Sequence, residues 1–169
     1  MNQTLSSWNE AGQAEALQTM LACCGARRWA AAMVALRPIA GVVELSEAAD
    51  RIWNSLQEAD WREAFACHPP IGDRTAAPSS GKSTAWSRQE QSSAAGAPAS
   101  VLLELAAGNA LYEQRFGFRY IVCATGKTAE EMLAILHRRL AGERPGELRE
   151  AAEQQRQITQ IRLGKWLIE

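Results

Sequence analysis

The chain has two histidines, and of these His68 stands where an imidazole could face a cavity. A predicted helix ends there because the next residues, Pro-Pro-Ile-Gly over 69–72, cannot continue it. So rigid a turn could fix the direction of the ring, as a general base or acid requires. A structural histidine in an ordinary turn is the alternative. His137 lies late in another predicted helix, where a basic residue is favoured without any chemistry.

Ser87 and Glu90 form a second candidate group because they stand one helical turn apart. One interpretation is structural, since Ser-x-x-Glu is the capping-box pattern that starts a helix. In the other, both side chains face the same cavity as His68. A carboxylate close to an imidazole raises the basicity of the ring or shares a proton with it.

The third candidate is the segment 118–124, Phe-Arg-Tyr-Ile-Val-Cys-Ala. Its β-branched and aromatic residues predict an extended conformation, but no partner strand is recognisable. Buried backbone groups are costly when unpaired, so protein loops or a ligand must satisfy them. A planar ligand rich in hydrogen-bonding groups, such as a urea or a hydantoin, would suit this edge. Gly126-Lys127-Thr128 is not the end of a phosphate loop, because the upstream glycine of that pattern falls at Ile121.

Arg162 stands between apolar residues in the last predicted helix. An arginine there is usually solvated or lies at the edge of the core; if it points inward, it needs an anion or an oxygen-rich ligand. We expect no metal site, since Cys67 and His68 alone do not supply the ligands that zinc needs. The Gly-x-Ser-x-Gly elbow of a serine hydrolase does not occur.

Helical patterns occupy nearly all of the chain that must position these groups. Apolar spacing, caps and prolines predict helices over 9–22, 27–36, 46–56, from 60 to about 65, 87–95, 98–116 and 128–140, and a last one from Pro145. The first would bury Ala14, Leu17 and Leu21, and Ser46 would cap the third. Residues 73–85 are predicted to be a loop. The predicted fold class is all-α: a single-domain compact bundle of about eight helices over residues 1–169, with a short extended active-site segment around 118–124.

The composition excludes several classes of protein. The chain has 169 residues, 47% of them hydrophobic, with 18 basic and 19 acidic side chains. That balance argues against a nucleic-acid partner, and the hydrophobic fraction argues against disorder. We expect no membrane span, because no stretch is apolar for long enough, and residues 1–7 do not resemble a signal peptide. The four cysteines fit no zinc pattern, so we expect small buried thiols in a reduced, cytoplasmic protein.

Four motifs, taken in order, resemble one family. They lie at 64–72, which contains His-Pro-Pro-Ile-Gly, and at 86–91, 116–127 and 158–163. The family is that of the 2-oxo-4-hydroxy-4-carboxy-5-ureidoimidazoline (OHCU) decarboxylases of purine catabolism. His-Pro-x-Ile-Gly alone would be weak evidence, but four motifs in the right order over nearly the whole chain are specific. The resemblance implies an all-helical homodimer that needs no metal or organic cofactor. It also implies a cofactor-independent carboxy-lyase that converts the small molecule OHCU, formed during urate degradation, to (S)-allantoin and CO₂.

The resemblance also assigns roles to individual residues. His68 would be the central catalytic base or acid, with Glu90 as its partner. The remaining residues would contact the substrate through polar side chains, backbone groups or apolar walls: Pro69, Ser87, Gln91, Phe118, Ile121, Cys123 and Arg162.

Two rival interpretations stay open at this stage. A hydrolase acting on a ureide or a cyclic amide would bind the same functional groups, with His68 and Glu90 activating water. A helical interaction module without enzymatic activity would use Ser87 and Glu90 only as a cap and His68 only as a turn residue.

Overall fold

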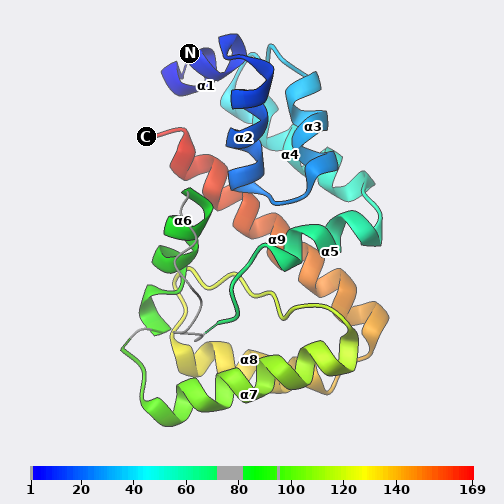
Figure 1. Ribbon diagram of the computed structural model, residues 1–169, viewed down its shortest axis with the longest axis vertical. Coiled ribbons are helices and arrows are strands. Elements are labelled where there is room, and N and C mark those ends of the chain that lie inside the picture. Colours follow the sequence, from blue (N-terminus) through cyan, green and yellow to red (C-terminus); the bar gives the residue numbers. More distant parts are fainter. Residues whose placement is uncertain (1, 72–81, 95) are drawn as a thin grey trace. The chain divides into compact units, whose positions relative to one another are not determined.

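The computed structural model describes residues 2–71, 82–94 and 96–169 (Figure 1). Over these residues the chain forms nine α-helices and one short 3₁₀-helix, η1 (Ser92–Ala94), and no strand, which confirms the predicted all-α class. The loop predicted over 73–85 is wrong for 82–85, where a helix has already begun; its other residues lie outside the described part of the chain.

Two compact units make up the chain. One is Met1–Ala64 together with Arg156–Glu169, and the other is Phe65–Gln155. We call them unit 1 and unit 2 and describe each by itself. The prediction of one domain over residues 1–169 stays a prediction.

Unit 1 is built from the helices near both ends of the chain: α1 (Gln3–Glu10), α2 (Gln13–Cys23), α3 (Arg27–Ala35), α4 (Val42–Ser55), most of α5 (Glu58–Ala66) and the last part of α9 (Arg144–Trp166). Its core contains Trp29, which is fully buried and donates its indole N–H to the carbonyl oxygen of Ala49 at 3.0 Å. Trp8 and Trp166 meet edge to face with ring centroids 5.9 Å apart, an arrangement that the charge distribution of aromatic rings favours.

Two helix predictions in unit 1 are wrong in their boundaries. The helix predicted over 9–22 is two helices, because Asn2 caps an earlier helix that ends at Glu10, and a second one begins at Gln13. The second helix buries Ala16, Met20 and Cys23 instead of the predicted Ala14, Leu17 and Leu21. Ser46 is no N-cap either. It lies inside α4, which begins at Val42, and its hydroxyl donates to the side-chain oxygen of Gln160 at 2.8 Å.

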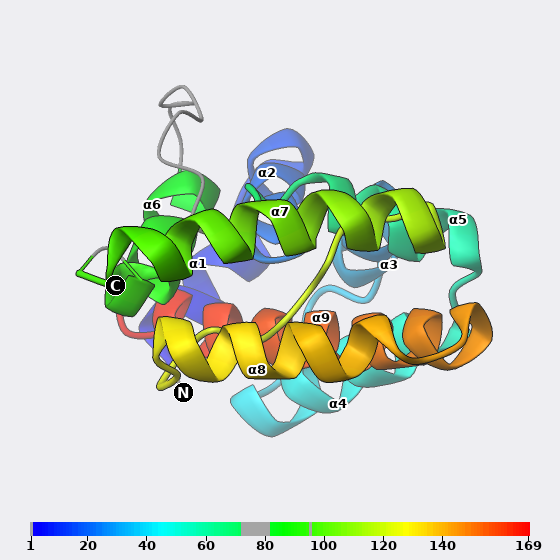
Figure 2. The same ribbon diagram turned by 90° about the horizontal axis from the view of Figure 1, so that it is seen from below.

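Unit 2 contains α6 (Lys82–Glu90), α7 (Ala99–Phe116), α8 (Ala129–Leu140) and the first part of α9. As predicted, α7 ends at Gly117, whose positive φ of 79° suits glycine, and Thr128 opens α8 with a complete capping box. Between these two points the chain runs back along α7, so that α7 and α8 lie side by side and point in the same direction (Figures 1 and 2).

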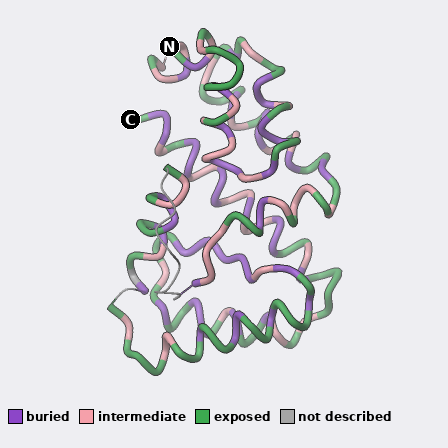
Figure 3. The backbone as a smooth tube through the Cα atoms, in the orientation of Figure 1, coloured by how far each residue is buried: buried purple, intermediate pink, exposed green. Residues whose placement is uncertain are grey.

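The segment between Gly117 and Thr128, which we call the returning connection, forms much of the core of unit 2. Its residues 120–124 are all buried, and they appear as a continuous buried stretch in Figure 3. The ring of Phe118 lies 5.8 Å from that of Phe65 and 5.8 Å from that of Tyr112. Tyr112 also packs against Tyr120 at 5.3 Å. Aromatic burial of this kind contributes on the order of 1.5–3 kcal/mol per side chain, which holds the irregular segment against α7.

Candidate active site

The turn that carries His68 is clamped by a side chain from the returning connection. Helix α5 ends at Ala66, and the guanidinium of Arg119 then donates to the carbonyl oxygens of Ala66, at 3.4 Å, and of His68. These hydrogen bonds satisfy carbonyl groups that the end of a helix leaves exposed. The first and third motifs, more than fifty residues apart in sequence, therefore meet within unit 2.

The imidazole of His68 is half-buried and has a defined partner. Its Nε2 atom lies 2.7 Å from the side-chain oxygen Oε1 of Gln155, which is fully buried in α9. An amide oxygen can only accept a hydrogen bond, so in this arrangement Nε2 is the donor. His68 is thus held in one orientation.

The capping interpretation of Ser87 and Glu90 is wrong. Helix α6 begins five residues before Ser87, at Lys82, and Glu90 is its last residue, so neither stands in its first turn. Both side chains are buried, with exposed fractions of 3% and 8%. The next residue, Gln91, donates its side-chain amide N–H to the carbonyl oxygen of Pro69 at 3.4 Å, which links the end of α6 to the His68 turn.

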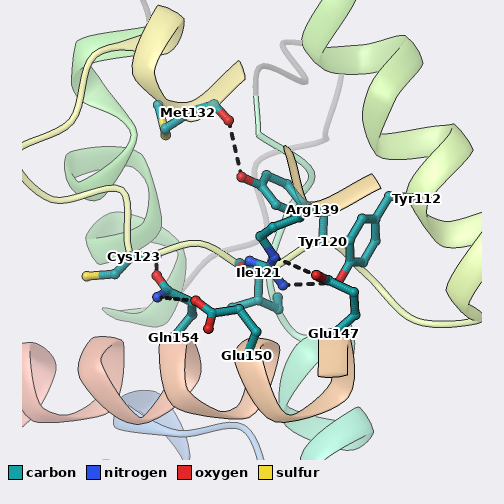
Figure 4. A network of polar contacts seen from close by, with 9 residues as sticks. All are labelled: Tyr112, Tyr120, Ile121, Cys123, Met132, Arg139, Glu147, Glu150 and Gln154. Carbon is teal, nitrogen blue, oxygen red and sulfur yellow. Dashed lines mark hydrogen bonds and ion pairs between the residues drawn. The ribbon is translucent and has the colours of Figure 1, made fainter. Parts of the chain in front are cut away.

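Side chains from two helices hold the backbone of the returning connection where a sheet would use a neighbouring strand (Figure 4). From α8, Arg139 Nη1 donates to the carbonyl oxygen of Ile121 at 2.5 Å. From α9, the side-chain oxygen of Gln154 accepts from the amide of Cys123 at 2.8 Å. The carbonyl oxygen of Cys123 accepts from Lys127 Nζ, also at 2.8 Å. The protein itself therefore satisfies both backbone groups of Cys123.

Arg139 belongs to a buried polar network with Glu147 and Tyr112 (Figure 4). Its Nε donates to a carboxylate oxygen of Glu147 at 2.8 Å, and the hydroxyl of Tyr112 donates to the same oxygen at 2.7 Å. Burial raises the pKa of Tyr112 and of Tyr120 above the usual value, although the positive charge of Arg139 opposes the increase. The network fixes Arg139 and, through it, the Ile121 carbonyl.

Other backbone groups of the connection have no such anchor. Within the described residues, no hydrogen bond reaches the amide of Ile121 or either backbone group of Val122. Both residues are buried, with exposed fractions of 2% and 5%. A buried backbone group without a partner costs about 1–3 kcal/mol, and a ligand can remove that cost.

Arg162 lies in the part of α9 that belongs to unit 1. Its side chain is buried, with an exposed fraction of 2%, and Nη1 donates to the carbonyl oxygen of Ala22 at 3.5 Å. The side chain is therefore not solvated. Of the two alternatives for Arg162, the one that applies is an inward-pointing arginine that needs oxygen partners. Along α9, buried polar residues recur at helical spacing on one face: Gln155, Thr159 and Arg162.

The structure thus brings the His68 turn, the end of α6 and the connection 118–124 together within unit 2. It also reveals residues that the sequence did not single out: Asn109, Arg119, Arg139, Gln154 and Gln155. Asn109 is buried in α7 and donates to the carbonyl oxygen of Ile71, at the end of the His68 turn, at 3.2 Å. Polar side chains of these types are common on protein surfaces, so no local signal marks these residues as part of the site.

Cysteines and possible metal ligands add little to the site. Three cysteines are buried as predicted, but Cys67 is exposed because it lies in the turn after α5. Among the described residues, no three His, Cys, Asp or Glu side chains are placed to hold a metal ion. No helix in the described part of the chain has both the length and the apolar character needed to cross a membrane.

Comparison with known proteins gives consistent matches. The family model described as OHCU decarboxylase matches residues 9–164. The chain is 34% identical over 142 residues to the 2-oxo-4-hydroxy-4-carboxy-5-ureidoimidazoline decarboxylase of Amia calva, covering 79% of this chain and 77% of that one. It is 41% identical over 145 residues to the uric acid degradation bifunctional protein TTL of Arabidopsis thaliana. That match covers 85% of this chain but only 44% of the plant protein.

Solved structures agree with these sequence matches. A crystal structure of an OHCU decarboxylase in the presence of (S)-allantoin superimposes with a TM-score of 0.76 at 36% identity, over 88% of this chain and 96% of that one. A crystal structure of an (S)-allantoin synthase has a TM-score of 0.71 at 19% identity, over 96% of this chain and 53% of that one. At that identity the second match concerns the fold alone.

Proposed function

Because the chain belongs to the OHCU decarboxylase family, we propose that it converts OHCU to (S)-allantoin and CO₂ in urate degradation. The observation that carries this proposal is the clamp of Arg119 on the His68 turn, which joins two of the four family motifs within unit 2. The chain spans less than half of the bifunctional plant relative, and the proposal concerns the decarboxylase reaction only.

The reaction needs no electron sink from the protein. A ring C=N bond lies next to the carbon that loses CO₂, so the electron pair of the breaking C–C bond can move into it. The protein must orient the carboxylate, stabilise the developing charge and deliver one proton to one face of the planar intermediate. Delivery to a single face gives (S)-allantoin, whereas the spontaneous reaction gives the racemate.

We assign this proton chemistry to His68 and Glu90. The imidazole is held in one orientation, and Glu90 is buried at the end of α6, next to the residue that contacts Pro69. General acid–base groups held in this way contribute roughly 10²–10⁴-fold to the rate. A site with few waters strengthens electrostatic stabilisation, and the buried Ser87 and Ile121 favour such a site.

The backbone of the returning connection is proposed to recognise the ureido group or the ring edge. The amide of Ile121 and both backbone groups of Val122 lack partners among the described residues, which supports this role. Phe118 would contribute to this recognition through its backbone, and Pro69 and Ile121 would provide the apolar walls. Cys123 would act by placing the segment, since its own backbone groups are already paired.

Three side chains are proposed to hold polar groups of the substrate: Ser87, Gln91 and Arg162. For Arg162 the support is its burial and its position in the fourth family motif, and its planar guanidinium suits a carboxylate. We further propose that the protein is a cytoplasmic homodimer. The family resemblance supports the dimer, and the four free cysteines are consistent with a reducing compartment.

The experiment adds purified full chain to freshly generated OHCU and follows circular dichroism and CO₂ release together. We expect accelerated formation of optically active allantoin with one equivalent of CO₂. Decay to racemic allantoin at the uncatalysed rate would contradict the proposed function. Accelerated consumption without CO₂ release would instead identify the rival hydrolase.

A further inference from the structure

Gln155 is in direct hydrogen-bond contact with the His68 ring, and the proposed reaction does not use it. Its Oε1 atom lies 2.7 Å from His68 Nε2, and its side chain has no exposed surface. We propose that Gln155 is a positioning residue that holds the Nε2 proton and thereby fixes both the tautomer and the orientation of His68. This inference rests on the proposed function for its catalytic consequence, but not for the contact itself.

The contact has a chemical consequence for the ring. A neutral imidazole carries its proton on one nitrogen and its basic lone pair on the other. With the Nε2 proton donated to an amide oxygen, the lone pair of the neutral ring is on Nδ1. In this tautomer Nδ1 is the basic nitrogen of His68, and the hydrogen bond from Nε2–H opposes rotation of the ring.

The rest of the turn is held independently of Gln155. Arg119 clamps the carbonyl oxygens of Ala66 and His68, and Gln91 donates to that of Pro69. Loss of the Gln155 amide should therefore remove the acceptor of the Nε2 proton while leaving the backbone of the turn in place. An effect on catalysis would then come from the imidazole and not from a displaced loop.

Imidazole ¹⁵N spectra test this assignment without any substrate. The chain has two histidines, and His137 is exposed near the end of α8, so the spectrum contains two ring systems that His137→Asn distinguishes. We expect the neutral His68 ring to be the Nε2–H tautomer in the wild-type protein. Gln155→Met should give a mixture of tautomers, whereas Gln155→Glu, which keeps an acceptor oxygen, should retain the Nε2–H form.

Gln154→Met is the matched control for the spectrum, because the adjacent Gln154 accepts from Cys123 and does not contact His68. It should leave the tautomer of His68 unchanged. For Gln155→Met we expect kcat to fall by roughly 10- to 100-fold with little change in KM, a part of the contribution of a general base. Gln155→Glu should restore most of that loss.

The outcomes separate this inference from the proposed function. A wild-type His68 ring protonated on Nδ1, or a Gln155→Met variant that keeps both the tautomer and kcat, would overturn the inference. The wild-type spectrum alone can overturn the inference, so the test does not depend on whether the variants fold. A protein with the expected tautomer but no activity on OHCU would contradict the proposed function and leave the contact standing.

Discussion

Arg139→Met should destabilise the protein strongly, because it breaks a buried ion pair without removing the partner charge. Glu147 has an exposed fraction of 7% and would lose its hydrogen bond from Arg139 Nε. The carbonyl oxygen of Ile121 and the hydroxyl of Tyr112 would lose their donors as well. Removing one member of a buried, hydrogen-bonded pair costs about 3–5 kcal/mol of unfolding free energy.

Two further variants show whether the unpaired buried charge of Glu147 causes the loss of unfolding free energy. Arg138→Met changes the neighbouring arginine, which is exposed on α8, and should alter stability by no more than about 0.5 kcal/mol. The double variant Arg139→Met, Glu147→Gln removes the charge of both partners. It should therefore be more stable than Arg139→Met alone, by roughly 1–3 kcal/mol.

Urea unfolding followed by far-ultraviolet circular dichroism measures these differences, provided that the slope with denaturant stays constant. Arg139→Met should also raise KM for OHCU, since the Ile121 carbonyl loses its anchor. A loss of less than 1 kcal/mol in the single variant, or a double variant no more stable than the single one, would refute the reasoning.

Three other predictions concern catalysis, binding and alkaline stability. Glu90→Gln should lower kcat for OHCU by roughly 10²-fold or more, while Glu130→Gln on the exposed start of α8 should not; equal activities would reject the role of Glu90. Arg162→Lys should raise KM more than it lowers kcat, because an ammonium cannot replace a bidentate guanidinium; an unchanged KM would count against substrate contact. Burial raises the pKa of Tyr112 and Tyr120, so the folded state keeps protons that the unfolded state loses above about pH 10. Unfolding free energy should therefore fall as pH rises above about 10, and less steeply in Tyr120→Phe; a flat profile up to pH 11.5 would contradict this.

Local signals in the sequence predicted the parts of the fold that depend on neighbouring residues. The capping box at Thr128 and the helix stop at Gly117 are both present in the structure, because each depends on side chains within one turn of the chain. The same kind of signal wrongly indicates a helix start at Ser87, because this Ser-x-x-Glu pattern lies inside a helix that begins at Lys82.

Partners that are distant in sequence could not be predicted in this way. Gln155 meets His68 across 87 residues, and Arg139 meets Ile121 across 18. Their amino-acid types are ordinary on a helix surface, and only the packing of the helices in unit 2 shows that they are buried. The segment 118–124 combines a feature that the sequence predicts with one that it does not. Its lack of a partner strand was readable from sequence, but the side chains that replace the strand were not.

The most direct test of the central claim compares His68→Asn with His137→Asn, the two histidine variants that the chain allows. Turnover of freshly generated OHCU is measured for each, together with the thermal midpoint. His68→Asn should lose roughly 10²–10⁴-fold in kcat at a nearly unchanged midpoint, while His137→Asn keeps wild-type turnover. Equal turnover in the two variants would show that His68 takes no part in the reaction.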